Sequence, residues 1–354
     1  MERVRLLHYL FALRAMAFHL YFIRRVLFVI PTLFGITLAA FLIANAIPAD
    51  PVTANLPQSA LNNEEIVEAF RQRWGLDEPA HEQYLTYVKN LVRGDLGTSI
   101  KTKRPVADDI QQFLPATFEL ATAGIISGVI IGVSVGIIAA VWRNSLADYV
   151  ARVFALTGVS FPVFLLALVL LQILYVELGL TSGPGRLDVR MPKPLNRTGL
   201  FTIDALLSGD WTTFRNAVSH LILPGLVLGI YVSGVIARIT RSSMLEVLGM
   251  DYIRTARGKG LREHAVIVRH ALSNAAIPVV TVIGLSYGSL LSGAVLTESI
   301  FAWPGIGRYL FRAATSQDFP AIMGVSILIA FIYVGVNFAV DILYYFLDPR
   351  IRNP

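Results

Sequence analysis

The sequence contains no cysteine and is poor in charged residues. The absence of cysteine among 354 residues excludes disulfides, thiolate nucleophiles and cysteine metal sites. Charged residues make up 15% of the chain, whereas a soluble domain has about 25%. Hydrophobic residues make up 55%, and the mean hydropathy is +0.62. This balance indicates that much of the chain lies in a lipid bilayer.

The sequence also lacks the patterns that enzymes use to bind phosphates or metals. Its only Gly-Lys pair, Gly258-Lys259, is followed by Gly260 and not by the Ser or Thr that a phosphate-binding loop requires. The six histidines form no metal-like pair at helical spacing beside acids, and no nucleophile is paired with a candidate base. We therefore expect no catalytic residue, no metal site and no cofactor in this chain.

Long apolar runs dominate what is present. A helix needs roughly 20 apolar residues to cross the hydrocarbon core, in which every backbone polar group requires a partner. The runs are unbroken rather than alternating, which favours helices over the strands of a barrel. They predict an all-α integral membrane fold with six transmembrane helices, at residues 26–46, 116–141, 153–176, 221–237, 275–297 and 321–347.

Basic residues are concentrated in one set of the predicted loops. With the N-terminus inside, the inner segments 1–25, 142–152, 238–273 and 348–354 carry 16 basic and 6 acidic residues, whereas the outer segments carry 14 and 16. Because cytoplasmic loops are enriched in Lys and Arg, both termini are predicted to be cytoplasmic. Topology thus explains the formal charge of +6, and nucleic acid is not needed as a partner.

The two longest outer loops differ in character. The loop 47–115 is predicted to hold two short amphipathic helices, one over 64–74 and one from Pro79 to just before Gly94. Asn63 is the expected N-cap of the first helix, and Gly75 is its expected stop. The loop 177–220 is rich in Gly and Pro near its start and is predicted to be irregular.

Residues 1–23 are predicted to form a separate segment before the main domain, 24–354. They are apolar but interrupted by His8, Arg14 and His19, which fits an amphipathic helix on the inner membrane surface. No cleavage site of small residues follows, so a signal peptide is not expected. A true start at Met16 is an alternative that the sequence leaves open.

Glycines recur every four residues within the predicted spans and so share a helical face. Small residues allow the backbones of two membrane helices to approach closely, which is how such helices gain packing energy. We expect these glycines to pack helices rather than to bind a solute. They are Gly124, Gly128, Gly132 and Gly136 in the second span, Gly225 and Gly229 in the fourth, and Gly284 and Gly288 in the fifth.

A few polar residues in or near the spans are candidates for a solute pathway. Ionisable groups are costly in a membrane and usually have a reason to be there. Glu119 is expected at the outer N-terminus of the second span, where the helix dipole favours an anion. Asp341 is expected to pair with an inner arginine. Glu298, at the outer mouth of the fifth span, is a candidate for an external gate, and Asn337 either lines the path or bonds a neighbouring helix.

The inner loop 238–273 is the most informative segment. Asp251 is expected to cap a short helix over 252–257, which Gly258 and Gly260 interrupt, and a second helix is expected over 261–272. Two short helices joined by glycine at the membrane surface suit docking on a cytoplasmic partner. A plain solvated basic loop is the alternative that spacing alone leaves open.

The same loop resembles the ATPase-docking loop of permeases in bacterial binding-protein-dependent ABC importers, most closely the dipeptide/oligopeptide/nickel branch. The general family pattern is Glu-Ala-Ala, three residues, Gly and later Leu-Pro. Here Arg-Thr-Ala replaces the first triplet, as in the peptide branch, and Ser273 replaces the proline. The matching residues are Asp251, Tyr252, Ile253, Arg254, Thr255, Ala256, Arg257, Gly258, Lys259, Gly260 and Leu261, followed by Arg269, His270, Ala271, Leu272 and Asn274.

Other parts of the chain are similar to the same family and occur in the same order. They are the segments 24–33 and 48–51 around the first span, 94–99 and 114–117 before the second, the outer loop 301–307 and the C-terminal 348–352. The chain departs from the family in its N-terminal extension before Phe22 and in extra length around 186–216. The latter concerns the face on which an external solute-binding protein would dock.

The resemblance implies a type I ABC importer permease with a cytoplasmic coupling helix near 250–261, placed in the bacterial inner membrane. It implies as partners a second homologous permease subunit, two ATPase subunits that bind ATP and Mg, and an external periplasmic solute-binding protein. The expected solutes are di- or oligopeptides. Oligosaccharides, opines, glutathione or nickel are alternatives within the same class, and a neighbouring gene for the binding protein would discriminate them.

A different class, the ion-coupled secondary carrier, is a weaker alternative. Such a carrier uses charges at mid-membrane or broken helices around a central site. The predicted spans contain only two acids, both near helix ends, and no Lys or Arg deep inside. An ABC exporter would normally carry an ATPase of its own, for which this chain has no motif.

Overall fold

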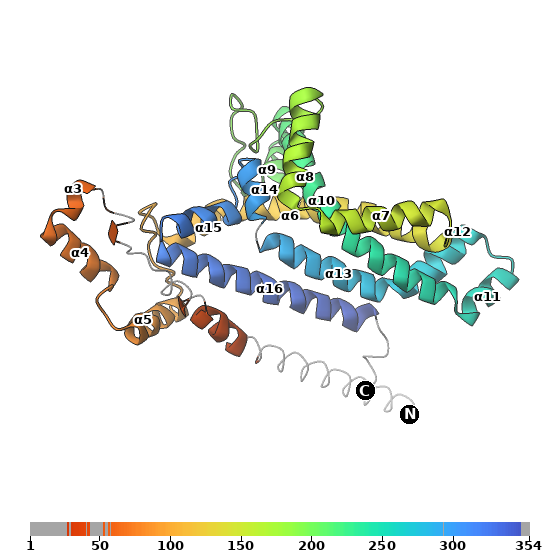
Figure 1. The fold of residues 1–354 in the computed structure, drawn as a ribbon, viewed down its shortest axis with the longest axis horizontal. Coiled ribbons are helices and arrows are strands. Elements are labelled where there is room, and N and C mark those ends of the chain that lie inside the picture. Colours follow the sequence, from red (N-terminus) through yellow and green to blue (C-terminus); the bar gives the residue numbers. More distant parts are fainter. Residues whose placement is uncertain are drawn as a thin grey trace, which may run out of the picture. The chain divides into compact units, whose positions relative to one another are not determined.

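The computed structural model describes residues 27, 30–39, 41–42, 52–53, 56, 58–292 and 294–347. Apart from one isolated bridge between Thr98 and Pro105, the regular elements in these residues are helices (Figure 1). The predicted all-α fold is therefore confirmed. The N-terminal segment 1–23 lies outside the described residues, and the predicted domain boundaries remain predictions.

Four helical segments in the described chain are long and apolar enough to cross a membrane, namely 106–141, 211–248, 263–291 and 319–340. A fifth arises if residues 146–158 and 163–177, which meet at 105°, form one bent span. The first predicted span, 26–46, is described only in part, and its apolar helix Ile30–Ala39 is shorter than a span. Four or five of the six predicted spans are thus present in the described residues.

The chain divides into two compact units. One contains residues 1–108 and 313–354, and the other contains residues 109–312. The chain passes between them within two helices, α6 (Val106–Val141) and α15 (Ile306–Thr315). Each unit is described below by itself.

The first unit contains α3 (Gln58–Leu61), α4 (Glu64–Trp74), α5 (Ala80–Val92) and α16 (Phe319–Leu347). The side chain of Asn63 accepts hydrogen bonds from the backbone N–H groups of Glu65 and Ile66, so it caps α4 as predicted. Gly75 ends the helix at φ +62°, a left-handed conformation that favours glycine. The two helices predicted for the loop 47–115 are both present.

Contacts within this unit attach the loop to α16. Val52, Phe70 and Ile100 form a small buried apolar cluster. The hydroxyl of Ser99 donates a hydrogen bond to the carboxylate of Asp318, and the backbone N–H of Lys101 donates to the same carboxylate at 3.0 Å. Because Asp318 lies directly before α16, these bonds connect the loop to the beginning of that helix.

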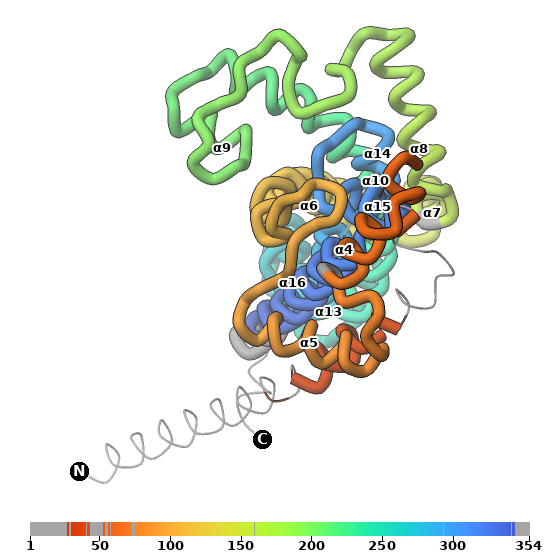
Figure 2. Tube along the Cα trace, turned by 90° about the vertical axis from the view of Figure 1, so that its left-hand side faces the viewer, coloured from red at the N-terminus to blue at the C-terminus, as the bar shows by residue number. Residues whose placement is uncertain are grey.

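The second unit is a bundle in which α6, α7, α10 and α13 run alongside one another, with α11 beyond the end of α10 (Figure 1). The chain between η1 and α10, which includes α9, extends to one side of the bundle (Figure 2, upper left). Its elements after α6 are α7 (Leu146–Ser160), α8 (Val163–Leu170), the π-helix η1 (Leu171–Glu177), α9 (Phe201–Leu207), α10 (Trp211–Leu248), α11 (Asp251–Gly258), α12 (Glu263–Ala265), the π-helix η2 (Val266–Leu272), α13 (Ser273–Leu291) and α14 (Val295–Ile300).

The helix α10 is much longer than the predicted span 221–237. Asp210 caps its beginning by accepting a hydrogen bond from the backbone N–H of Thr213 at 3.0 Å. Pro224 lies inside the helix, as membrane helices tolerate. The prediction ended the span where arginines begin, but arginine is a good helix former, and the helix continues to Leu248.

Other predicted boundaries are also corrected. The second span begins at Val106 rather than at 116, because α6 continues without interruption through Pro115. The second inner helix, predicted over 261–272, is not separate. It consists of α12 and η2, which continue into α13 as one candidate span, 263–291. The fifth span therefore begins and ends earlier than the predicted range 275–297.

The glycines of α6 lie against α10. A Cβ atom added at Gly128 would lie 3.2 Å from the carbonyl oxygen of Gly229, and one at Gly132 would lie 2.8 Å from that of Ser233. From the other side, a Cβ at Gly229 would meet the backbone N of Gly128 at 3.0 Å. The hydroxyl of Ser127 also donates to the carbonyl of Gly225 across the interface. The two backbones are thus in close contact along this face.

Candidate functional site

The helix α11 forms an exposed element with a buried inner side. Of its eight residues only Ile253 and Ala256 are buried, with 0% and 8% of their surfaces exposed. They stand three positions apart and therefore share one face of the helix. Asp251 is the first helical residue and Met250 is the N-cap, with no side-chain capping bond, so the prediction that Asp251 caps this helix is wrong.

A glycine and an ion pair define where α11 ends. Gly260 adopts φ +77°, which a residue with a side chain rarely adopts, and its N–H donates to the carbonyl of Arg257 at 2.9 Å. The guanidinium of Arg257 binds the carboxylate of Glu263 through two hydrogen bonds, of 3.1 Å and 2.6 Å. These bonds hold the turn between α11 and α12 and raise the pKa of Arg257.

The buried side of α11 packs on both neighbouring span helices. Ile253 and Ala256 belong to a buried apolar cluster that includes Met244 and Val247 of α10. The same cluster includes Val266 and Ala271 of η2 and Ala275 of α13, together with Ala140 of α6. This packing joins α11 to the last turns of α10 and to the beginning of the following span.

The exposed side of α11 and the turn that follows it combine cations with exposed apolar groups. Tyr252 and Leu261 are 44% and 43% exposed, beside the exposed Arg254 and Lys259. Tyr and Arg are the residue types that most often dominate protein interfaces. Of the predicted docking residues Ala256 is the exception, since it is buried and supports the helix from within. The exposed members are Asp251, Tyr252, Arg254, Thr255, Arg257, Lys259, Gly260 and Leu261.

Glu298, a candidate for the gate, is fully buried in a network of hydrogen bonds. Its carboxylate accepts from the hydroxyl of Thr117 at 2.7 Å and from the backbone N–H of Arg308 at 2.8 Å. The Thr117 hydroxyl in turn accepts from the backbone N–H of Ile306. Burial raises the pKa of Glu298, and these hydrogen bonds act in the opposite direction. In this conformation the side chain fixes the segment after α14 on α6 and contacts no open space.

The remaining candidates are placed as follows. Asn337 lies half-buried on α16, and the side chain of Asp341 lies outside the described residues. Gly288 is buried on α13 and Gly284 is partly buried there. Neither Asn337 nor Glu298 lines the cavity described below.

Glu119 is not at a helix N-terminus, because α6 begins at Val106. The prediction of a dipole effect is wrong, and the carboxylate has specific partners instead. Arg186 donates to it at 2.7 Å, and both groups are buried. The backbone N–H and the hydroxyl of Thr202 donate to its other oxygen. Burial lowers the pKa of Arg186, and its pairing with Glu119 opposes that effect.

A second ion cluster was missed from sequence. Asp148 of α7 is buried, and the guanidinium of Arg241 binds it through two hydrogen bonds, of 2.8 Å and 2.9 Å. Arg152 lies 3.4 Å from the same carboxylate. The available signal was the spacing of Arg238 and Arg241 on what is in fact a continuous helix, but the predicted span ended before them.

Together, the apolar helical spans and the exposed helix α11, which packs on two of them, define a multi-spanning membrane component. Residues 132–353 match the family of binding-protein-dependent transport system inner membrane components, and residues 18–121 match the N-terminal region of such components. The chain belongs to this family of ABC transporter permeases. It is a non-catalytic, multi-pass inner-membrane component, and membership implies an ATPase and a binding protein as partners.

Peptide permeases are among its most similar relatives. The chain is 46% identical to the probable D,D-dipeptide transport system permease protein DdpB of Escherichia coli strain K12, over 90% of this chain and 93% of that protein. It is also 46% identical to the dipeptide transport system permease protein DppB of Alkalihalophilus pseudofirmus, over 94% and 99%. The identity to the di/tripeptide transport system permease protein DppB of Pseudomonas aeruginosa is 46%, over 93% and 98%.

Proposed function

We propose that this permease imports di- or oligopeptides, which it receives from an external binding protein and releases into the cytoplasm. The three relatives reported above are named for dipeptide or di/tripeptide transport and align over nearly their full lengths. A match of that extent covers the spans and loops on both sides of the membrane. It supports a peptide solute over the oligosaccharide, opine, glutathione and nickel alternatives.

The observation that supports ATP-driven transport is the geometry of α11. Its exposed side presents Tyr252 and Arg254, with Leu261 exposed in the turn that follows, while its buried side packs on α10 and on the beginning of the next span. This arrangement suits a rigid coupling helix that an ATPase subunit holds and moves. The other surface residues of the loop, from Asp251 to Leu261, would form the rest of the contact.

The full assembly would contain a second homologous permease, two ATPase subunits and the external binding protein. ATP and Mg would bind to the ATPase subunits, and this chain would contribute no catalytic group. Both termini would be cytoplasmic, since the basic inner segments, including the loop that holds α11, then face the cytoplasm. In this orientation α11 lies on the side where ATP is available.

Transport would proceed by alternating access. Closure of the ATPase pair on ATP would move α11, and the cluster around Ile253 would carry that motion to α10 and α13. The close backbone contact between α6 and α10 lets these two helices move together. Opening on the outer side would require the segment held by Glu298 and Thr117 to move with α6.

Affinity purification from native membranes tests the assembly. The tagged wild-type chain, purified in mild detergent, should bring with it a second permease and an ATPase subunit, identified by mass spectrometry. Replacement of the exposed Tyr252 and Arg254 by Ala and Glu should abolish recovery of the ATPase and leave recovery of the second permease unchanged. Arg143→Glu, at an exposed turn on the same predicted side, is the matched control. Undiminished recovery of the ATPase with the α11 variant would exclude α11 as the dock.

A further inference from the structure

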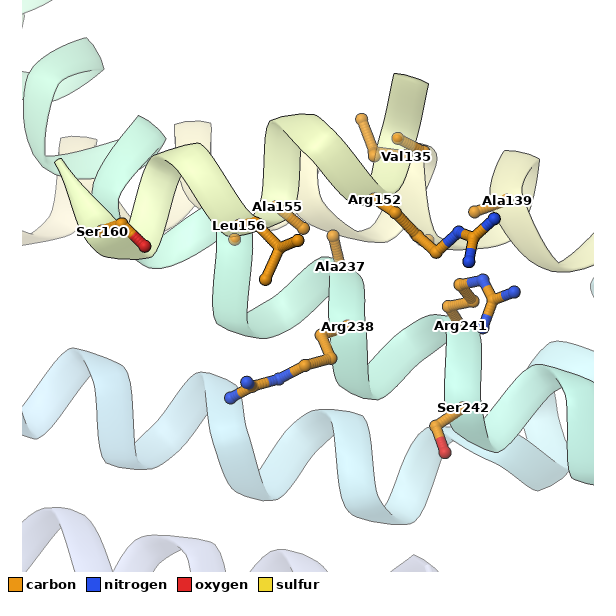
Figure 3. Close-up of a pocket in the computed structure, with 13 residues that line it drawn as sticks. Val135, Ala139, Arg152, Ala155, Leu156, Ser160, Ala237, Arg238, Arg241 and Ser242 are labelled. Carbon is orange, nitrogen blue, oxygen red and sulfur yellow. The ribbon is translucent and has the colours of Figure 1, made fainter. Parts of the chain in front are cut away.

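A cavity of about 530 Å³ lies between α6, α7 and α10 (Figure 3). Small residues on the three helices make up much of its wall, including Ala139, Ala155, Gly234 and Ala237. The space is within the range of about 300–1,000 Å³ that is usual for small-molecule sites. None of the residues that line it carries a carboxylate, whereas three of them are arginines.

The three arginines, Arg152, Arg238 and Arg241, differ in how they are paired. Arg241 is bound by two hydrogen bonds to Asp148. Arg152 lies near the same carboxylate and stacks on Tyr149, with its guanidinium carbon 4.4 Å from the ring centroid. Arg238 has no hydrogen bond or ion pair with any residue in the described part of the chain, and it points away from the other two (Figure 3). Arg238 is exposed, so its guanidinium is accessible to an anion from elsewhere.

Charge and apolar surface are separated along the cavity. Arg152 lies in the first half of α7, whereas Leu156 and Ser160 lie towards its end. On α10, which runs in the opposite sense, Gly234 precedes Arg238 and Arg241. The cationic end therefore faces the helix ends that the proposed orientation assigns to the cytoplasmic side, and the apolar end lies deeper. A ligand that matches this order has an anionic head and an apolar tail.

We propose that this cavity binds an anionic phospholipid of the cytoplasmic leaflet, with the phosphate of its head group at Arg238. The planar guanidinium fits phosphate geometry and forms strong, charge-assisted hydrogen bonds. Basic pockets between membrane helices on the cytoplasmic side bind anionic head groups in this way. The acyl chains would lie along Ala155 and Leu156. The proposal depends on the proposed orientation of the spans but not on the transported solute.

A peptide solute fits this cavity less well than a lipid does. A peptide zwitterion carries an ammonium group, which needs an acceptor as well as a cation for its carboxylate. The carboxylate of Asp148 contacts two arginines of the cationic wall, and it already accepts hydrogen bonds from Arg241 and from the backbone N–H of Asn144. A phosphodiester with two acyl chains needs no such acceptor.

Native mass spectrometry of the purified transporter tests the proposal. Phosphatidylglycerol, phosphatidylcholine and inorganic phosphate are titrated separately into the delipidated complex, and bound molecules are counted. We expect the wild type to retain phosphatidylglycerol in preference to phosphatidylcholine. Arg238→Gln should weaken phosphatidylglycerol binding about tenfold, the effect of one lost charge-assisted contact. Arg238→Lys, which keeps the charge, should retain most of the binding.

Matched controls separate this site from general attraction to a basic surface. Arg143→Gln removes an exposed arginine of the same predicted side that does not line the cavity, and it should leave lipid binding unchanged. Equal retention of both lipids, or unchanged phosphatidylglycerol binding in Arg238→Gln, would overturn the proposal. Displacement of the lipid by inorganic phosphate would assign the site to a soluble anion instead. Displacement of the lipid by alanyl-alanine would assign the cavity to the transported solute and would also overturn the proposal. A failure to transport peptides would not change these lipid-binding measurements, so the two proposals are tested separately.

Discussion

Single glycines determine how closely α6 approaches α10. At Gly132 an added Cβ would lie 2.8 Å from the carbonyl oxygen of Ser233 and 2.8 Å from the Cβ of Ile236. The first of these contacts is with backbone, so rotation of a side chain does not relieve it. At Gly335 on α16, in contrast, no atom lies within 4 Å of the same position. The same substitution should therefore have opposite effects at these two glycines.

Gly132→Ala should destabilise the protein by about 1–3 kcal/mol, because the methyl group forces the two helices apart. Gly335→Ala should stabilise it slightly, since alanine favours a helix over glycine by about 1 kcal/mol. Thermal unfolding of the detergent-purified chain measures both effects. Equal shifts of the two melting temperatures would show that the α6–α10 contact does not limit stability.

Arg186 and Glu119 form a buried pair whose separate loss should be costly. Arg186→Met leaves the Glu119 carboxylate buried without its cation, at a cost of about 3–5 kcal/mol. The double variant with Glu119→Gln removes the uncompensated charge and should recover a large part of that loss. The cycle is measured by thermal unfolding and by proteolysis of the segment 187–200. If the double variant is as unstable as the sum of the single ones, the pair is not coupled.

This pair also shows what sequence reasoning does not reach. Glu119 was recognisable as an acid inside a span, but its partner Arg186 lies 67 positions away, in the loop 177–220. That loop was predicted to be irregular, and it in fact contains α9 and the beginning of α10. Neither spacing nor composition indicates which loop residue folds back onto a helix. The unpaired Arg238 was missed for another reason, because the predicted span ended one residue before it.

At the scale of elements, helices with local signals were predicted most accurately. The beginning and end of α4 follow from Asn63 and Gly75, whose effects depend only on neighbouring residues. The long helices α6 and α10 were predicted too short, because hydropathy marks the part of a helix in lipid and not the helix itself. Their polar ends are stabilised by tertiary contacts such as that between Asp148 and Arg241.

The chain before α9 should become less ordered in acid. Burial of Asp204 disfavours its charge, but hydrogen bonds from Thr198, Gly199 and Arg197 outweigh burial and lower its pKa. A lowered folded-state pKa gives stability that is present above the ordinary value, near 3.8, and is lost as pH falls through the folded value. The protection factors for hydrogen exchange at 197–204, which correct for the pH dependence of intrinsic exchange, should fall below about pH 4 in the wild type. In Asp204→Asn the protection factors should be low already at neutral pH and should change little in acid. If they fall in acid as much as in the wild type, the effect belongs to another titrating group.

The buried side of α11 should matter for coupling even though it cannot touch a partner. Ile253→Ala removes a fully buried side chain from the cluster with Met244 and Val266, which costs about 2–5 kcal/mol locally. Hydrogen exchange at 250–262 should rise, and ATP hydrolysis stimulated by the binding protein should fall. Ile222→Ala, at an exposed position on α10, is the control and should change neither. Faster exchange with undiminished stimulation would separate α11 from coupling.

On the scale of the whole molecule, the chain is a non-catalytic permease subunit, and its proposed role is mechanical. Its α11 packs on span helices through apolar side chains, and α6 and α10 contact each other through their glycine faces. The ATPase subunits would act on the exposed surface of α11, and the resulting movement would change the side of the membrane to which the solute path opens. The family could be recognised from motifs that occur in the same order across the chain. The assignment of the solute, in contrast, rests on similarity to peptide permeases.

Uptake into proteoliposomes tests the central claim most directly. The purified transporter is reconstituted with ATP inside at the ATPase face, and the binding protein with a radiolabelled dipeptide is supplied on the opposite face. We predict ATP-dependent accumulation of the dipeptide, competition by unlabelled di- and tripeptides, and loss of accumulation when Tyr252 and Arg254 are replaced by Ala and Glu. Accumulation driven by an ion gradient without ATP, or unaffected by the α11 replacements, would contradict the account.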